Sequence, residues 1–202
     1  MTELTTMKAI AQLVPQGARV LDLGCGDGAL LEHLVRERGC TGYGVELDDA
    51  NVLACTRRGV NVLQLNLEDG LAIFGDNSFD VVLQIDTLQH LRNAEVMLQE
   101  TARIGKQGVV AFPNFAHWQN RLSVLRGRMP VTRRLPYQWY DTPNIRVGTY
   151  RTSRCWPPRT GCAFWTPSGC RVERWCAACP ICWRPRRCFT SSTPRLSGCG
   201  MT

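Results

Sequence analysis

The chain has 202 residues, 44% of them hydrophobic, and a formal net charge of +7. Its length suits one well-packed core and is short for two. It contains no run of roughly eighteen apolar residues, which a transmembrane helix would need, and residues 1–10 lack the apolar stretch of a signal peptide. These features exclude an obvious membrane protein, and we expect a cytoplasmic protein without membrane contact.

The charge and the cysteines are divided unevenly along the chain. Residues 1–150 hold fifteen basic and sixteen acidic residues, whereas residues 151–202 hold nine arginines, no lysine and one acid. The second segment also contains eight of the eleven cysteines and four of the six tryptophans. A basic protein usually suggests nucleic acid, but the larger segment has no basic excess, so we expect no nucleic-acid partner. We predict a folded domain over 1–150 and a disordered tail over 151–202.

Residues 1–112 alternate between helical and strand patterns. The apolar spacing and the turn residues predict helices over 4–14, 29–38, 49–58 and 87–104, and strands over 19–23, 43–47, 60–65, 79–85 and 108–112. Asp48 is the expected N-cap of the third helix. Strands that alternate with helices indicate an α/β fold, a Rossmann-like sheet of parallel strands.

The strongest local signal is the turn Gly24-Cys25-Gly26-Asp27-Gly28, which follows the first strand. A glycine-rich turn lets the backbone approach a ligand closely and begins a helix with free amides. Glu46 ends the second strand, about twenty residues on, where a carboxylate accepts both hydroxyls of a ribose. The spacing Gly24-x-Gly26-x-x-Ala29 also fits a dinucleotide fingerprint, so an NAD-binding oxidoreductase stays open at this point.

Three features favour S-adenosylmethionine over a dinucleotide. Asp22, two residues before the first glycine, suits a ligand with a cationic end better than one with a pyrophosphate. Asn66-Leu67-Glu68 follows the third strand, where a polar side chain or amide can meet adenine. Residues 76–80, Asp-Asn-Ser-Phe-Asp, resemble the entry to strand four of class I methyltransferases.

A narrower resemblance lies beyond the fifth strand. The segments that carry it, besides Leu88-Gln89, are Phe112-Pro113-Asn114-Phe115-x-His117-Trp118, Arg126 to Thr132 and Leu135 to Ile145. Over about 15–150 the chain resembles the MetW family of methionine biosynthesis. The resemblance implies a class I methyltransferase fold, S-adenosylmethionine as cofactor and a homoserine O-acyltransferase as partner. It implies no particular methyl acceptor and leaves open whether the protein is an enzyme or a non-catalytic activator or sensor.

When the family's cofactor site is transferred by position, the resemblance implies eight residues here. The first strand and the glycine turn supply Asp22, Gly24, Cys25 and Gly26, the end of the second strand supplies Glu46 and Leu47, and Asn66 and Leu67 flank the adenine. Asn66 stands where the family often has an acid. We assign no catalytic residue and no metal ligand, because methyl transfer from a sulfonium needs alignment more than a general base.

An aromatic and arginine-rich stretch follows the fifth strand. It includes His117-Trp118, residues 137–140 and four arginines, Arg126, Arg128, Arg133 and Arg134. One interpretation is a substrate or partner surface over the cofactor, and the other is a packed cap over the sheet with solvated arginines. Within residues 1–150, His90 and His117 are the candidates for an acid–base role.

The tail itself has the composition of a GC-rich gene read out of frame. Cys176-x-x-Cys179-x-x-Cys182 has metal-ligand spacing, but a frame-shift near codon 151 explains the cysteines, arginines and prolines together. Read one base earlier, the codons of residues 155–157 and 164–166 give apolar segments. Such a tail would lack the antiparallel C-terminal hairpin of class I methyltransferases. We therefore expect an uncovered edge on the fifth strand and poor solubility.

Overall fold

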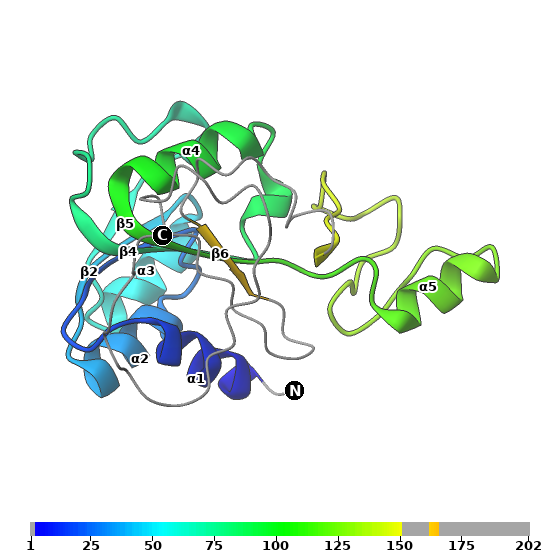
Figure 1. Cartoon of the computed structure of the whole chain (residues 1–202), viewed down its shortest axis with the longest axis horizontal. Helices are drawn as coiled ribbons and strands as arrows, with labels where there is room; N and C mark the ends of the chain where they lie inside the picture. Colours follow the sequence, from blue (N-terminus) through cyan, green and yellow to red (C-terminus); the bar gives the residue numbers. More distant parts are fainter. Residues whose placement is uncertain (1–2, 151–161, 166–202) are drawn as a thin grey trace, which may run out of the picture.

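The computed structural model describes residues 3–150 and 162–165, and its centre is a six-stranded sheet (Figure 1). The strands are β1 (Arg19–Leu23), β2 (Thr41–Glu46), β3 (Val62–Gln64), β4 (Phe79–Ile85), β5 (Gly105–Ala111) and β6 (Cys162–Trp165). They lie in the order β3-β2-β1-β4-β5-β6, and every pair is parallel. The predicted α/β fold with a Rossmann-like parallel sheet is confirmed.

Helices cover both faces of the sheet. The covering helices are α1 (Glu3–Leu13), α2 (Ala29–Arg38), α3 (Asp49–Arg57) and α4 (Ala94–Ile104). A further helix, α5 (Trp118–Leu125), lies away from the sheet, and two short 3-10 turns are η1 (Leu67–Asp69) and η2 (Leu88–His90). In Figure 1, α1 and α2 lie on one side of the sheet and α4 on the other. Crossing a membrane takes a helix of at least 18 residues with few charges, and none of the helices within the described residues has this property.

The two faces of the sheet form separate apolar cores. Val20, Val81 and Leu83 pack with residues of α1, α2 and α3, whereas Leu21 and Val82 pack with residues of α4 and the 67–79 segment. This alternation follows from the period of two in a β-strand. Burial on both faces explains the apolar run over residues 81–83 in the centre of β4.

The strand order reverses at β1. The chain moves from β1 outward to β2 and β3, and then returns to place β4 on the other side of β1. In open parallel sheets, ligands bind at the carboxyl ends of the strands beside such a reversal. The carboxyl end of β1 leads directly into Gly24, so the topology places the glycine turn at the expected position.

The predicted helix over 87–104 is wrong in one respect, because η2 and α4 are separate elements. Glu68, from the preceding connection, accepts hydrogen bonds from the backbone amide of Arg92 and from the side chain of Asn93. A carboxylate that binds the amide of Arg92 takes the place of a helical carbonyl partner. This contact from a distant segment breaks the helix, although the apolar spacing continues through it.

The expectation of an uncovered edge on β5 is also wrong. Residues 108–111 of β5 pair with residues 162–165 of β6, so the backbone of β5 is covered over that length. The pairing is parallel, not the antiparallel pairing expected at this position of the fold. The expected disorder of residues 151–161 and 166–202 and the Cys176-x-x-Cys179-x-x-Cys182 spacing lie outside the described residues, whereas residues 162–165 of the predicted tail form β6.

Candidate functional site

The glycine turn is fastened to the end of β2. The amides of Gly24 and Cys25 both donate to the carbonyl of Val45, at 2.8 and 3.1 Å. Gly24 and Gly26 have φ values of +76° and +56°, a region that side chains with a Cβ rarely adopt. The turn therefore holds a backbone path that glycine permits, and it brings four of the predicted residues, 22, 24, 25 and 26, next to β2.

Glu46 forms the second wall of the site. Its Oε2 accepts a hydrogen bond of 2.8 Å from the amide of Gly26, and its Oε1 accepts from the amides of Leu47 and Asp48. These bonds join the glycine turn to the end of β2 through one carboxylate. A carboxylate has about four acceptor positions, so Glu46 retains capacity for a ligand hydroxyl while it holds the turn in place.

Asp22 lies beneath the turn and is buried, with 2% of its surface exposed. Its Oδ1 has no hydrogen-bond partner among the described residues. Burial, and secondarily the negative charge of Glu46, raises the pKa of Asp22 from an ordinary 3.8 to about 7. A buried acceptor without a partner is costly, and at a ligand site it points to a donor that the ligand supplies.

The two carboxylates beside the glycine turn favour a ligand with a cationic group over a ligand with a pyrophosphate. The negative charge of Glu46 lies close enough to Asp22 to disfavour ionisation of the Asp22 carboxyl. A cationic amino group relieves this repulsion and supplies a donor to the orphaned Oδ1 of Asp22. A pyrophosphate would add negative charge to the same place. The site residues therefore fit the amino-acid end of S-adenosylmethionine better than the phosphates of a dinucleotide.

The adenine-end residues lie at the same edge but have structural roles of their own. Asn66 is the N-cap of η1, and its Oδ1 accepts a hydrogen bond from the amide of Glu68. The side chain of Leu67 is buried in the core on the α4 face, and the side chain of Leu47 is 58% exposed. The amide of Leu65 donates to the backbone carbonyl of Glu46, so the segment that leads to Asn66 is bonded to the end of β2. The predicted contact of Asn66 and Leu67 with adenine stays a prediction.

Comparison with known proteins shows the family to which the chain belongs. Residues 5–153 match the family described as methionine biosynthesis protein MetW, which is well over half of the chain. The chain belongs to the MetW family. It is 38% identical over 153 residues to a bifunctional methionine biosynthesis protein MetXA/MetW from Rhodopirellula baltica, covering 70% of this chain and 24% of that protein.

Other relatives of this MetW-family chain are methyltransferases. It is 34% identical over 98 residues to a ubiquinone biosynthesis O-methyltransferase from Maricaulis maris, covering 46% of this chain and 38% of the relative. The chain thus spans well under half of these two proteins. A solved S-adenosylmethionine-dependent methyltransferase from Thermotoga maritima, described as a possible histamine N-methyltransferase, has a TM-score of 0.59 at 24% identity, covering 78% and 70% of the two chains. This likeness shows the methyltransferase fold.

The structure adds two residues to the candidate site that the sequence did not single out. Thr87 is buried, and its Oγ1 donates to the carbonyl of Leu23 at 2.9 Å. A Cβ on Gly24 would lie 2.5 Å from that Oγ1, so Thr87 leaves no room for a side chain at position 24. Cys55 donates to the carbonyl of Gly26, and its Sγ lies 3.7 Å from that of Cys25. Both contacts join residues that are far apart in sequence.

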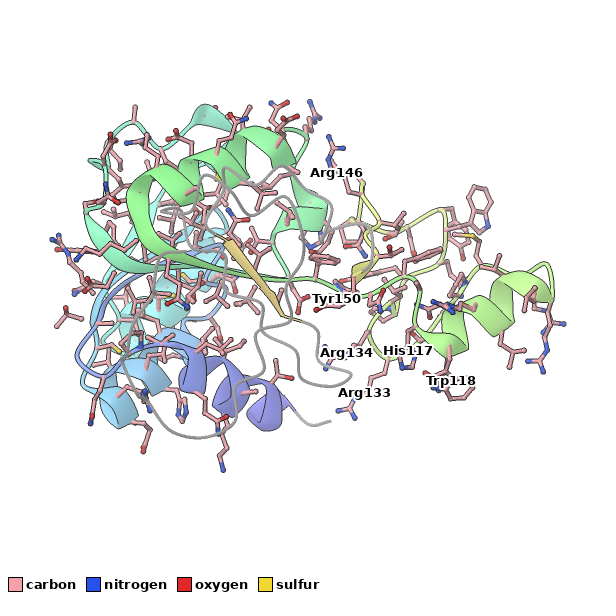
Figure 2. The ribbon with its side chains drawn as sticks, viewed as in Figure 1. His117, Trp118, Arg133, Arg134, Arg146 and Tyr150 are labelled. Atoms are coloured by element: carbon pink, nitrogen blue, oxygen red, sulfur yellow. The ribbon has the colours of Figure 1, made fainter. Side chains whose placement is uncertain are left out.

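A cavity of about 640 Å³ lies beside this site, not in it. It is lined mainly by residues of η2 and α4, by residues that follow β5 and by residues 144–149, and none of the eight predicted cofactor residues lines it. The aromatic stretch does not form a packed cap over the sheet, because Trp118, Trp139 and Tyr140 are 64–71% exposed. Figure 2 shows His117 and Trp118 on the part of the molecule that extends away from the sheet. His90 contacts the carbonyl of Pro143 at 3.2 Å.

Proposed function

We propose that this chain is a cytoplasmic S-adenosylmethionine-binding protein of methionine biosynthesis that acts together with a homoserine O-acyltransferase. The observation that carries the cofactor assignment is the buried Asp22, whose Oδ1 lacks a partner below a glycine turn held by Glu46. The observation that supports the partner is the relative from Rhodopirellula baltica, whose name joins MetXA and MetW in one protein.

Each site residue has a defined task in this proposal. Asp22 receives the ammonium group of the cofactor, and Glu46 receives the ribose hydroxyls with the acceptor capacity left by its three amide contacts. Gly26 leaves open space where a Cβ would stand, which lets the cofactor approach the turn. Asn66 and Leu67 lie beside the adenine. The bound cofactor would supply an activated methyl group on its sulfonium.

Two versions of the function differ in what happens to that methyl group. In one version the protein transfers it to an acceptor, and alignment supplies most of the rate. In the other, the protein is a non-catalytic activator of the acyltransferase, and cofactor occupancy reports the cellular supply of methionine. The exposed aromatic and basic segment beyond β5 supports the activator version, because it offers a partner surface without a closed acceptor site.

One experiment separates the two versions. The purified full chain is incubated with acyltransferase, homoserine and the acyl donor, with and without S-adenosylmethionine labelled on the methyl group. An activator raises acyltransferase activity and leaves the label on the cofactor, whereas an enzyme moves the label to protein or small molecule. No effect on the acyltransferase and no transfer of label would contradict the proposal in both versions.

The NAD-binding alternative is tested by direct titration. The two carboxylates at the turn disfavour a pyrophosphate, so we expect S-adenosylmethionine to bind and NAD to bind at least about tenfold more weakly, a difference of about 1.4 kcal/mol. Tighter binding of NAD would reject the cofactor assignment and leave the family membership as it is.

A further inference from the structure

A long segment between β5 and the end of the described domain extends away from the sheet. We call residues 115–147 the arm; it includes α5 and the turn between Thr132 and Leu135. Figures 1 and 2 show α5 far from the helices that cover the sheet. Only Asn120 and Pro130 are buried within the arm. The arm therefore contributes little to the core, and most of its side chains outside its base are available for another surface.

The arm is held firmly at its base. Asn114 pairs with Gly148, and the amide of Phe115 donates to the carbonyl of Gly148 at 2.9 Å. The Oδ1 of Asn114 accepts from the amides of Ala116 and Tyr150, which lie on the two chains of this neck. The buried Asn120 donates to the carbonyl of Asn114 at 3.2 Å. A surface held in this way loses little conformational freedom on binding.

The exposed side chains of the arm are those that form the centres of protein interfaces. Trp139 and Tyr140 are each 71% exposed, and their rings lie edge to face with centroids 5.7 Å apart. Leu125 is 84% exposed and Met129 is 58% exposed. Aromatic residues, methionine and arginine are enriched in interfaces. So much apolar surface on one extended segment indicates a binding surface.

The charge of the arm identifies the kind of partner. The arm contains six arginines and one acid, Asp141, for a net charge of +5, whereas residues 1–112 carry −6. The six arginines are exposed, and none of them is in an ion pair with another described residue. They are Arg121, Arg126, Arg128, Arg133, Arg134 and Arg146. An acidic rim around an apolar centre is the complementary surface.

The arm is also attached to the segment that positions the cofactor turn. The amides of Ile145 and Arg146 donate to the carbonyl of Gln89 in η2 at 3.0 and 3.1 Å, and the guanidinium of Arg146 donates to the carbonyl of Leu91. Thr87, which packs closely against Gly24, immediately precedes η2. One short segment therefore contacts the cofactor turn on one side and the arm on the other.

From these observations we infer that the arm is the docking surface for the homoserine O-acyltransferase, and that it meets an acidic, partly apolar face of that enzyme. This inference rests on the proposed function, since it names the surface through which the partnership acts. The relative whose name joins MetXA and MetW supports the acyltransferase as occupant, because it is 38% identical to this chain over 153 residues. The hydrogen bonds to η2 connect this docking surface to the segment that follows Thr87, which packs against the cofactor turn.

The test compares arm variants with matched variants on the body. Trp139→Ala/Tyr140→Ala removes the aromatic pair, and Arg133→Glu/Arg134→Glu reverses part of the charge. Ile73→Ala and Arg57→Glu are the controls, because both residues are exposed on the body and outside the cofactor site. Binding of the purified acyltransferase to each full-length variant is measured by calorimetry at two salt concentrations.

We expect each arm variant to bind the acyltransferase at least about tenfold more weakly, which is the range for interface hot spots. The charge variant should also lose most of the salt dependence. The controls should bind within about twofold of the original chain. All variants should bind S-adenosylmethionine as the original chain does, which shows that they are folded.

The outcomes separate the inference from the proposed function. If the original chain binds the acyltransferase and the arm variants bind equally well, the inference is overturned and the partnership stands. If the original chain does not bind the acyltransferase, the proposed partnership fails and the inference fails with it. The other possible occupant of the arm is a second copy of this chain, and sedimentation of the chain alone tests for it. If the chain self-associates, the arm variants abolish that association and the acyltransferase does not bind, the arm is a contact between copies and the inference is overturned.

Discussion

Replacement of Asp22 by asparagine should stabilise the ligand-free protein at neutral and alkaline pH. Burial and the charge of Glu46 raise the pKa of Asp22 from 3.8 to about 7. An acid whose pKa is raised by folding contributes stability below its unfolded pKa, and this stability is lost as the pH rises through the folded pKa. We therefore expect the free energy of unfolding to fall between about pH 4 and pH 7 and to stay level above that range.

The magnitude follows from the size of the pKa rise. At about 1.4 kcal/mol for each pH unit, a rise from 3.8 to about 7 makes the ionised carboxylate cost roughly 4 kcal/mol at pH 8. Asparagine removes the charge and keeps the shape, but its amide then lies buried without a partner for all of its groups. An unpaired buried group costs roughly 1–3 kcal/mol. The net gain for Asp22→Asn at pH 8 is therefore about 1–3 kcal/mol. Near pH 4 the charge cost is nearly absent, so the variant should be less stable than the original chain there, by up to about 3 kcal/mol.

Urea unfolding of the full chain and of Asp22→Asn across pH 4–8 measures this difference. The same variant should bind S-adenosylmethionine at least about tenfold more weakly, because the ammonium group loses its carboxylate partner. In the original chain, the affinity for the cofactor should rise with pH up to about 7, since binding requires ionised Asp22. Equal pH profiles for the two proteins, or a variant that is less stable at pH 8, would refute the reasoning.

Three further predictions concern the turn and the tail. Gly24→Ala should lower the free energy of unfolding by about 2–5 kcal/mol, because its Cβ would clash with Thr87 in addition to the strain of a positive φ. Gly26→Ala has the strain without the clash and should lower it by only about 1–2 kcal/mol. Urea unfolding of both variants measures the difference, and equal losses would contradict it. Gly26→Ala should nevertheless weaken binding of S-adenosylmethionine at least about tenfold in a calorimetric titration, since the methyl group would occupy space open to the ligand; undiminished affinity would argue against this approach path. Resequencing of the gene around codon 151 should reveal a one-base slip, and the corrected tail should raise solubility and melting temperature; an unchanged reading frame would remove the frame-shift hypothesis.

The local parts of the site follow well from the sequence. A buried apolar strand, a turn with glycines at positions 24, 26 and 28, and a helical pattern after it leave few alternatives for β1 and α2. Asp48 is the N-cap of α3 as expected, since its side chain accepts from the amide of Asn51. In each case the determinants lie within a few residues of one another, and the backbone has no need of a distant partner.

The features that escaped prediction depend on contacts between distant residues. Glu68 breaks the helix after η2 by binding the amide of Arg92, and no pattern within residues 87–104 shows this. Thr87 meets Gly24 only because β4 returns to the side of β1. The exposure of Trp139 is equally invisible in sequence, since an aromatic stretch suits a packed cap as well as a projecting arm.

The central claim is that the glycine turn, together with Asp22 and Glu46, binds S-adenosylmethionine. Calorimetric titration of the full chain and of Glu46→Ala with this cofactor tests the claim most directly. Glu37→Ala serves as the control, because Glu37 is an exposed acid of α2 outside the site. A charged hydrogen bond to a hydroxyl contributes about 1.5–3 kcal/mol, so Glu46→Ala should weaken binding roughly ten- to a hundredfold. Equal affinity for the original chain and Glu46→Ala, or no binding by the original chain, would contradict the claim.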